Sequence, residues 1–565
     1  MKIERVDDIP LIIAELEKSG LSDLLNKFFP DHGNWQGLSG GKVTTGFLTY
    51  VLSCSDHRLS HVESWAAGRL HVLGHCLSEP DIRPEDFSDD RLGKLLDRLD
   101  DEVQWNRLEC ALNQSLIRVH KLPVAEEAIR LDACIVQSFR DAEGLFQMGY
   151  SKQHRADLPQ IKVMLATLDP LSMPLAVEVV SGEKADDPLY IPVIKKVNDC
   201  LDTKGLFYVG DAKLGTLGNR AYLQQDGHYY LCPLAKKQCS TETLKAYLKD
   251  KPAKLQRLYS DENQTKVLTK AFECCEELST QEGLQWEERR IVVHSVAWAD
   301  AQQDKMKNRL DRAGEELEEL LVPKQRKQLP KTRADVELKV QRILKKHHVA
   351  AFFDIQIEEQ HTQTTLRKYG NKPERIRKDL SFELHIRRRE GAIEEHLQLL
   401  GWRVYATNIP KEKLSVNQAV LCYRQEYRIE HQFNKLLNKV TALMPVFLKK
   451  EHRIVALTKL MLLALKFVSL IQHKVRKQLQ KTGQYLKELF PGNPGRKTNQ
   501  PTTEMLLKAF NDISMVIMPT QDTFVLKMAK LKQIQLKILE LLNISPDIYL
   551  GLERISFFNS DFIET

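Results

Sequence analysis

The sequence predicts a multidomain protein in which a mixed α/β core is flanked by helical regions at both ends. Its 565 residues exceed one ordinary domain, and the length alone suggests roughly three or four domains. Apolar strand candidates are concentrated after about residue 125, whereas helical periodicity dominates before about residue 120 and after about residue 440. The hydrophobic content of 42% and the charged content of 28% are normal for a globular protein.

The first 120 residues have the pattern of helices. Apolar residues recur near helical spacing between Ile12 and Leu25, and again between Leu48 and Leu52. Between these stretches the glycine-containing segment 34–41 breaks the pattern, and we expect it to form a loop. The sequence therefore predicts a small all-helical domain at this end.

The segment after residue 125 has the pattern of a sheet. Three antiparallel strands, a helix and a further strand are the order expected of a ribonuclease-H-like α/β core, with a turn at Asp169-Pro170. The strand candidates are 128–136, 144–150, 162–168, 175–180, 206–211 and 228–231, and the helix is 190–201.

A long segment then interrupts this core. It contains a strand candidate at 290–296 and a charged helical pair whose turn is marked by Pro323 and Pro330. The core resumes with a strand at 402–408 and a helix from about Ser415 to Asn438. The predicted division is a helical N-terminal domain (1–120), the first part of the core (125–240), an insertion (241–400), the completion of the core (401–440) and a helical C-terminal region (441–565).

Composition limits the classes of function. The net charge of +7 and the pI of about 8.7 permit a polyanionic partner without requiring one. Lys459 and Lys466 interrupt the most apolar stretch, 454–471, so we expect a buried helix with snorkelling lysines and no membrane span. Ten cysteines without a C-x-x-C pair suit reduced thiols in a cytosol.

Three acids lie in contexts that suit metal binding. Asp132 is flanked by apolar residues within a strand candidate, Asp211 ends an apolar strand, and Glu430 is on a helix. An ionised carboxylate in a core strand is costly unless it is paired or binds a cation. Three acids that converge repel one another, and two Mg²⁺ ions relieve that repulsion. Each acid alone is more often a cap or a surface charge.

A second signal lies around Glu430. Tyr423 is seven residues before Glu430, so that the two would share a face of one helix. Arg424 and Arg428 are neighbours at a spacing of four, and phosphate would relieve their repulsion. The basic residues Lys435 and Lys439 extend this strip. The alternative is an exposed charged helix.

With these motifs the chain resembles the DDE transposases of bacterial insertion sequences, in the subgroup with a tyrosine–arginine–glutamate–lysine signature and a large insertion. The resemblance extends over nearly the whole chain and includes 6–10, 32–39, 56–62, 402–408, 491–494 and 496–510. It implies that Asp132, Asp211 and Glu430 are the catalytic, metal-binding acids and that Tyr423 lies near bound DNA.

The resemblance also implies cofactors and partners. We expect two Mg²⁺ ions, for which Mn²⁺ can substitute, double-stranded DNA at element ends and target, and a homodimer on DNA. A bacterial cytoplasmic location, at the nucleoid when DNA is bound, is expected. Lys152 and Arg155, in a turn after the second strand candidate, are further DNA-binding candidates beside Arg424, Arg428, Lys435 and Lys439; a solvated basic loop is the alternative.

Two departures from the signature leave alternatives open. Glu426 stands where the family has arginine, and Leu437 stands where it has lysine. Neighbouring basic residues can substitute, because phosphate contacts tolerate shifts along flexible side chains. The main expectation is a competent transposase. The alternatives are a catalytically weakened descendant that binds DNA as a regulator, and a nuclease of the same fold that acts on RNA–DNA hybrids.

Overall fold

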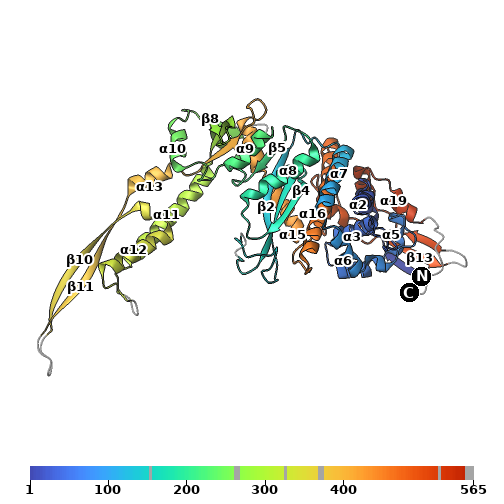
Figure 1. Ribbon diagram of the computed structural model, residues 1–565, viewed down its shortest axis with the longest axis horizontal. Helices are drawn as coiled ribbons and strands as arrows, with labels where there is room; N and C mark the ends of the chain where they lie inside the picture. Colours follow the sequence, from blue (N-terminus) through green and yellow to red (C-terminus); the bar gives the residue numbers. More distant parts are fainter. Residues whose placement is uncertain (152–154, 260–266, 324–327, 367–374, 520–523, 554–565) are drawn as a thin grey trace, which may run out of the picture. The chain divides into compact units, whose positions relative to one another are not determined.

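The computed structural model describes residues 1–151, 155–259, 267–323, 328–366, 375–519 and 524–553. They form two compact units, each assembled from segments that are far apart in the sequence. The first unit comprises Met1–Cys232, Leu278–Trp286 and Ala419–Thr565, and the second comprises Pro233–Glu277 and Glu287–Gln418. The expected mixture of helices and sheet is confirmed (Figure 1). The finer division into five segments stays a prediction.

The first unit is built around a mixed sheet. Among strands β2 to β6, β2 is in the middle; it pairs antiparallel with β3 and parallel with β5. β4 continues antiparallel beyond β3, and β6 continues parallel beyond β5. Every position of β3 is buried, which indicates that both faces of the sheet are covered there. The bounds are β2 Ala128–Gln137, β3 Gln160–Leu168, β4 Met173–Ser181, β5 Phe207–Gly210 and β6 Tyr229–Pro233.

The predicted strand at 144–150 is wrong. This segment makes only isolated bridges, between Glu143 and Phe146 and between Gln147 and Gln160. The antiparallel partner of β2 is instead β3, which buries more apolar surface and pairs with β2 over its whole length. Residues 138–159 thus form the connection between β2 and β3, and Ser138 closes it with a hydrogen bond to the carbonyl of Pro159.

Two helices pack together beside this sheet. α7 (Glu102–His120) begins at Asp101, whose carboxylate caps two backbone N–H groups, and α8 (Tyr190–Leu201) has the bounds that the sequence predicted. Both contact β4, and they contact each other. Their packing brings Cys110 and Cys200 together in a disulfide across 90 residues of sequence. The expectation that all cysteines are reduced is therefore wrong, because sequence spacing does not show which helices become neighbours.

α16 (Glu451–Thr482) is the long apolar helix of the first unit. It is long and apolar enough to cross a membrane, but 94% of its most apolar 18-residue window is buried inside the structure. Lys459 and Lys466 do not snorkel as predicted, because both side chains are buried by the surrounding protein. Instead Lys459 pairs with Glu102, and Lys466 pairs with Glu109.

The amino group of Lys466 is fully bonded inside the protein. It donates to Glu109 Oε1 at 2.9 Å, to Asn113 Oδ1 at 2.8 Å and to the carbonyl of Leu175 at 3.4 Å. Burial lowers the pKa of Lys466, and the Glu109 carboxylate opposes that shift. These bonds join α16 to α7 and to β4, so a single buried cation links three elements.

The two ends of the chain meet in a small sheet. β1 (Lys2–Arg5) pairs antiparallel with β13 (Ser514–Pro519), which pairs in turn with β14 (Phe524–Met528). The predictions of an all-helical N-terminal domain and a mostly helical C-terminal region did not include these strands, because the pairing of β1 with β13 joins segments far apart in the sequence. The helices here are α1 Ile9–Glu17, α2 Leu21–Phe28, α3 Gly40–Cys54, α4 Val62–Ala67, α5 Leu70–Cys76, α6 Asp89–Arg98, α17 Thr503–Lys508, α18 Gln533–Leu542 and α19 Asp547–Leu550.

The second unit contains a second set of strands and a helical pair. Its strands follow the order β12-β9-β8-β7, and the long hairpin of β10 and β11 packs on the helical pair through apolar side chains such as Ile355 and Phe382. The bounds are α10 Thr241–Lys249, β7 Gln256–Tyr259, β8 Val267–Ser279, β9 Gln285–His294, α11 Val296–Glu318, α12 Arg333–His347, β10 Phe353–Leu366, β11 Arg375–Arg388, α13 Glu390–Leu397 and β12 Trp402–Thr407. The predicted helical pair and strands are confirmed, whereas the hairpin was not foreseen.

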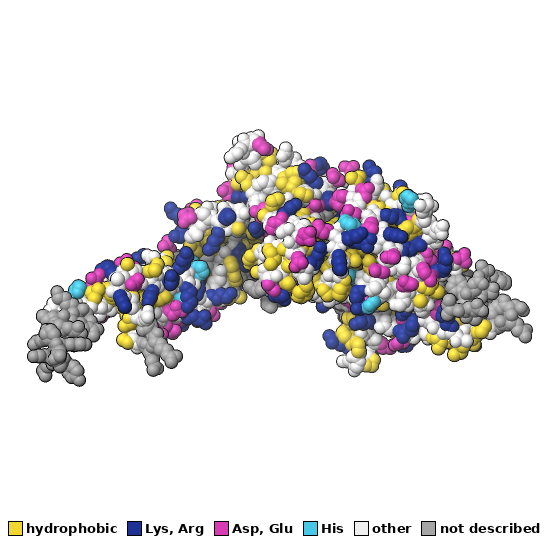
Figure 2. Space-filling view, turned by 60° about the horizontal axis from the view of Figure 1, so that its bottom comes forward, with side chains coloured by type: hydrophobic (Ala, Val, Ile, Leu, Met, Phe, Trp, Pro, Cys, Tyr) yellow, Lys and Arg dark blue, Asp and Glu magenta, His cyan; other side chains and the backbone are white. Residues whose placement is uncertain are grey.

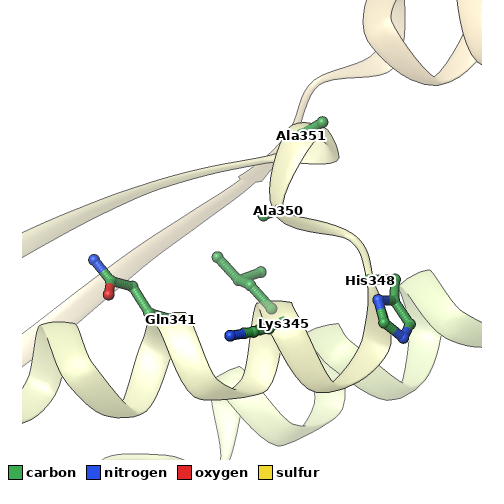
Figure 3. Close-up of a pocket in the computed structure, with 6 residues that line it drawn as sticks. Gln341, Lys345, His348, Ala350 and Ala351 are labelled. Atoms are coloured by element: carbon green, nitrogen blue, oxygen red, sulfur yellow. The ribbon is translucent and has the colours of Figure 1, made fainter.

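A hollow lies at the C-terminal end of α12. Gln341, Lys345 and His348 border it together with Ala350 and Ala351 of the turn that follows (Figure 3). The lining is mostly apolar, and Lys345 is the lining residue that carries a formal charge. It therefore lacks the convergent polar groups of a ligand site.

The buried ion pair of α16 makes a direct stability prediction. Lys466→Met should lower the free energy of unfolding by about 3–5 kcal/mol, because Glu109 is left buried without its cation. The measurement is the urea midpoint of the purified protein. Lys481→Met, at an exposed position of the same helix, should change stability by less than about 0.5 kcal/mol. Equal midpoints for the two variants would contradict the role given to Lys466.

Candidate active site

Two of the predicted acids are brought side by side by parallel strands. Leu131 of β2 is the register partner of Gly210 of β5, so the residues that follow, Asp132 within β2 and Asp211 just past the end of β5, lie next to each other. Neighbouring strands are about 4.8 Å apart. A Cβ atom at Gly210 would lie 2.9 Å from Leu214, so glycine allows the chain to turn closely just before Asp211.

Tyr190 holds the Asp211 carboxylate. The Tyr190 hydroxyl donates to Asp211 Oδ1 at 2.6 Å, and the backbone N–H of Lys213 donates to the same oxygen at 2.8 Å. Burial raises the pKa of Tyr190 well above its ordinary value, and the charges of Asp211 and Asp132 raise it further. Tyr190 is therefore a fixed donor next to both acids. Sequence reasoning missed it, because only the packing of α8 brings it to a residue 21 positions later.

Glu430 is on a helix that packs on the same strand. α15 (Tyr427–Asn438) contacts β2, with Ile429 and Phe433 buried and Glu430 exposed in its first turn. The predicted single helix from Ser415 to Asn438 is wrong: α14 (Val416–Arg424) ends before α15 begins. Tyr423 and Glu430 are consequently on different helices, so the spacing of seven residues within one helix no longer supports a shared face.

Glu426, at the break between these helices, is a fourth acid of the site. Burial raises its pKa, a hydrogen bond from Tyr423 opposes the shift, and the carboxylates of Asp211 and Glu430 raise it further. Glu426 therefore lies within electrostatic reach of both predicted ligands and bridges the sheet to α15. The sequence marked this position only as a departure from the family signature.

The three predicted acids share one region without forming one tight cluster. Among the described residues, the ligand atoms of Asp132, Asp211 and Glu430 do not all lie within 4.8 Å of one another. Glu358, Glu383 and His385 of the β10–β11 hairpin do, but all three are exposed, and such surface groups are common without an ion. A pair of ions about 3.5–4 Å apart spreads its ligands over a longer distance than one ion does.

A buried ion-pair network lies behind these acids. The Arg130 guanidinium donates to Asp169 Oδ2 at 2.7 Å and to the carbonyl of Cys422 at 2.8 Å. Arg428 approaches the same Asp169 oxygen to 3.2 Å. The network joins β2, the turn after β3 and both helices α14 and α15, so it fixes Glu426 and Glu430 relative to the strand that carries Asp132.

The predicted DNA-binding residues have different surroundings. Arg155 pairs with Asp157 on an exposed loop, and Lys152 lies outside the described residues. Tyr423 is buried, whereas Arg424 is exposed. Cationic and acidic side chains are intermixed over the face that Figure 2 shows. Contact of these residues with DNA stays a prediction.

The raised pKa of Glu426 predicts a pH-dependent stability in metal-free protein. The pKa of Glu426 is higher in the folded than in the unfolded protein. Its contribution to the free energy of unfolding is therefore fully present below about pH 4 and is lost as the pH rises through the folded pKa. Glu426→Gln, which can still accept from Tyr423, should therefore raise the urea midpoint at about pH 8 and leave it unchanged at about pH 4. For the exposed control Glu412→Gln, the urea midpoint should differ from that of the wild type by the same amount at both pH values. A pH-independent effect of Glu426→Gln would refute this account.

Comparisons with known proteins identify the family of the chain. A family model described as a domain of unknown function matches residues 1–108. The search of curated proteins found no match. Among solved structures, the search found the cryo-EM structure of a piggyBac transposase synaptic complex with hairpin DNA. The two chains are 9% identical, the match covers 79% of this chain and 82% of that one, and the TM-score is 0.20, which is too low to support an inference. The model of the transposase DDE domain matches residues 141–466, which include Asp211 and Glu430 and begin shortly after Asp132. Because that match covers more than half of the sequence, the chain belongs to the DDE transposase family.

Proposed function

We propose that this transposase cleaves DNA strands at the ends of an insertion sequence and transfers them to a target, using Asp132, Asp211 and Glu430 as its catalytic acids. The observation that carries the proposal is the register of two neighbouring parallel strands, which places Asp132 in β2 beside Asp211 at the end of β5, with α15 packed on β2. Phosphoryl transfer needs mainly positioning and charge stabilisation, which such a convergence of acids provides.

We infer that the core is ribonuclease-H-like. Three antiparallel strands (β2, β3, β4) precede α8, and the parallel strands β5 and β6 follow on the other side of β2. This order supports the topology that the sequence predicted, and it brings the first and second acids to adjacent strands.

The donor set fits a hard divalent cation. Asp132, Asp211 and Glu430 offer carboxylate oxygens, the ligands that Mg²⁺ prefers, and Mn²⁺ accepts the same donors. Among the described residues, both hydrogen bonds that Asp211 accepts reach Oδ1, which leaves Oδ2 for a cation. Two bound ions would activate water and stabilise the charge of the attacking and leaving oxygens.

The protein's own groups orient the acids. Tyr190 and the N–H of Lys213 fix the direction of the Asp211 carboxylate. The network of Arg130, Asp169 and Arg428 holds the helix break that carries Glu426. The mechanism requires no covalent intermediate with a protein side chain, because water and then a DNA 3′-hydroxyl act as nucleophiles.

The partners in this proposal are double-stranded DNA at element ends and at the target, and a second copy of the chain on the DNA. A bacterial cytoplasmic location, at the nucleoid during DNA binding, belongs to the same proposal. The mildly basic charge of +7 supports a polyanionic partner.

One observation favours the second candidate, a DNA-binding regulator with weakened catalysis. Leu437, at the position of the signature lysine, is buried in the apolar face of α15. Glu426, at the position of the signature arginine, supplies no cation there. Under this alternative the wild-type protein binds DNA with strong salt dependence and does not cleave it.

Replacement of the first acid separates the two candidates. Asp132→Asn should reduce Mg²⁺-dependent nicking to background while leaving DNA affinity nearly unchanged, because the substitution removes a ligand charge and retains the shape. The assay follows a labelled DNA fragment that contains the sequences flanking the coding region. The exposed control Asp23→Asn should nick as the wild type does. Binding without any wild-type nicking would favour the regulator.

Loss of the hydroxyl that orients Asp211 should change the metal requirement. Tyr190→Phe should raise the Mg²⁺ concentration for half-maximal nicking about tenfold or more, the cost typical for losing a partner of a metal ligand. Tyr208→Phe is the matched control, because this buried hydroxyl bonds Asn198 instead of an acid. The idea is refuted if both tyrosine variants have the metal requirement of the wild type.

A further inference from the structure

A cavity of about 880 Å³ lies between α15 and α16 in the first unit. Residues before β2, the turn after β3 and the segment before α17 complete its walls. Figure 1 shows α15 and α16 side by side, next to strands β2 and β4. The volume is that of a small-molecule site, roughly 300–1,000 Å³, and is too small for duplex DNA.

The cavity is lined by many cations and few acids. Arg428 and Lys435 come from α15, Lys439 follows its last residue, and Arg476 and Lys477 come from α16. Glu127 and Glu504 are the acids among the lining residues. Within the described residues, only Arg428 of the five cations has a carboxylate at ion-pair distance. Cations gathered in this way repel one another unless an anion binds between them.

Lys435 is the most informative of these cations. Burial lowers its pKa, and the charges of Arg476 and Lys439 lower it further, while Glu504 opposes them. Arg476 donates to the backbone carbonyls of Pro501 and Gln500, at 2.8 and 3.3 Å, instead of to an acid. The one carboxylate that acts on Lys435 thus faces three cations, Lys435, Arg476 and Lys439, so positive charge is in excess around this half-buried lysine.

The cavity is on the opposite side of α15 from the acids. Arg428 and Lys435 are spaced by seven residues, which places them on one side of the helix, and Lys439 follows directly after the helix end. Glu430 is two residues from Arg428, about 200° around the helix axis. One helix thus separates an acidic site, shared with β2 and β5, from a basic cavity, shared with α16.

Two glutamines add neutral acceptors to the cavity. Gln432 is 3% exposed and donates to Ser469 Oγ at 2.9 Å, which leaves its Oε1 buried without a partner among the described residues. Gln472 Oε1 is likewise buried and without a partner there. Buried acceptors normally have donors, so both oxygens are suited to N–H or O–H groups of a ligand.

We propose that this cavity binds one phosphate-bearing nucleotide, from the unpaired end of a DNA strand or from a free nucleotide. Lys435, Lys439 and Lys477 receive the phosphate, and Gln432 and Gln472 accept from the base or sugar. The site is separate from the three acids and does not depend on the proposed cleavage chemistry.

The test is fluorescence anisotropy with the full chain in EDTA, which removes any metal contribution of the acids. The probes are a 5′-phosphorylated thymidine tetranucleotide labelled at its 3′ end, and ATP as a competitor. Lys435→Met should weaken tetranucleotide binding about tenfold or more, as expected for a lost charge-assisted hydrogen bond. Lys477→Gln, at the exposed rim, should weaken it severalfold without affecting folding. The exposed control Lys481→Met should bind as the wild type does.

The two sources of the nucleotide give different results. Displacement of the tetranucleotide by ATP supports a free nucleotide, whereas binding that ATP does not displace supports a DNA strand end. The proposal is overturned if neither probe binds, or if Lys435→Met and Lys477→Gln both retain wild-type affinity. Asp132→Asn should bind the probe normally in EDTA, so loss of the cleavage proposal leaves this result intact.

Discussion

The buried contact of Lys466 with Glu109 and Asn113 is the constraint on which the first unit depends. It fixes α16 against α7 and β4, and α16 in turn contacts α6, α15 and α18. Burying two charged groups costs desolvation free energy. Their attraction offsets this cost only when the geometry is good and further hydrogen bonds form. The position of α15, and with it Glu430, follows from how this central helix is seated.

Much of the core could be predicted from the sequence, because its elements are strongly apolar and locally patterned. The helix at 190–201 and the strand that ends before Asp211 have this character, and both are confirmed. The strand at 144–150 failed because a longer apolar segment outcompeted it for β2. The helix break at Glu426 was missed because no proline or glycine marks it, and the Asp169 network that accompanies it is tertiary.

Only part of the candidate site could be predicted from the sequence, for the same reason. Strand register places Asp132 and Asp211 together, and local patterns suffice to nominate both. Tyr190 and the role of Glu426 arise from packing between distant segments, which spacing does not encode. The basic strip of α15 was recognised from its composition, yet its partners Arg476 and Lys477 come from another helix.

The pairing of β1 with β13 has a consequence for synthesis of the chain. Val6 and Asp7 donate to the carbonyl of Ile513, and the Tyr549 hydroxyl donates to the carbonyl of Asp7. A ribosome therefore releases the first strand long before its partner exists, and the exposed edge must wait through nearly the whole of translation. Termination before β13 leaves that edge open to other chains, so β1 is protected only after residues 514–519 have been synthesised and folded onto it.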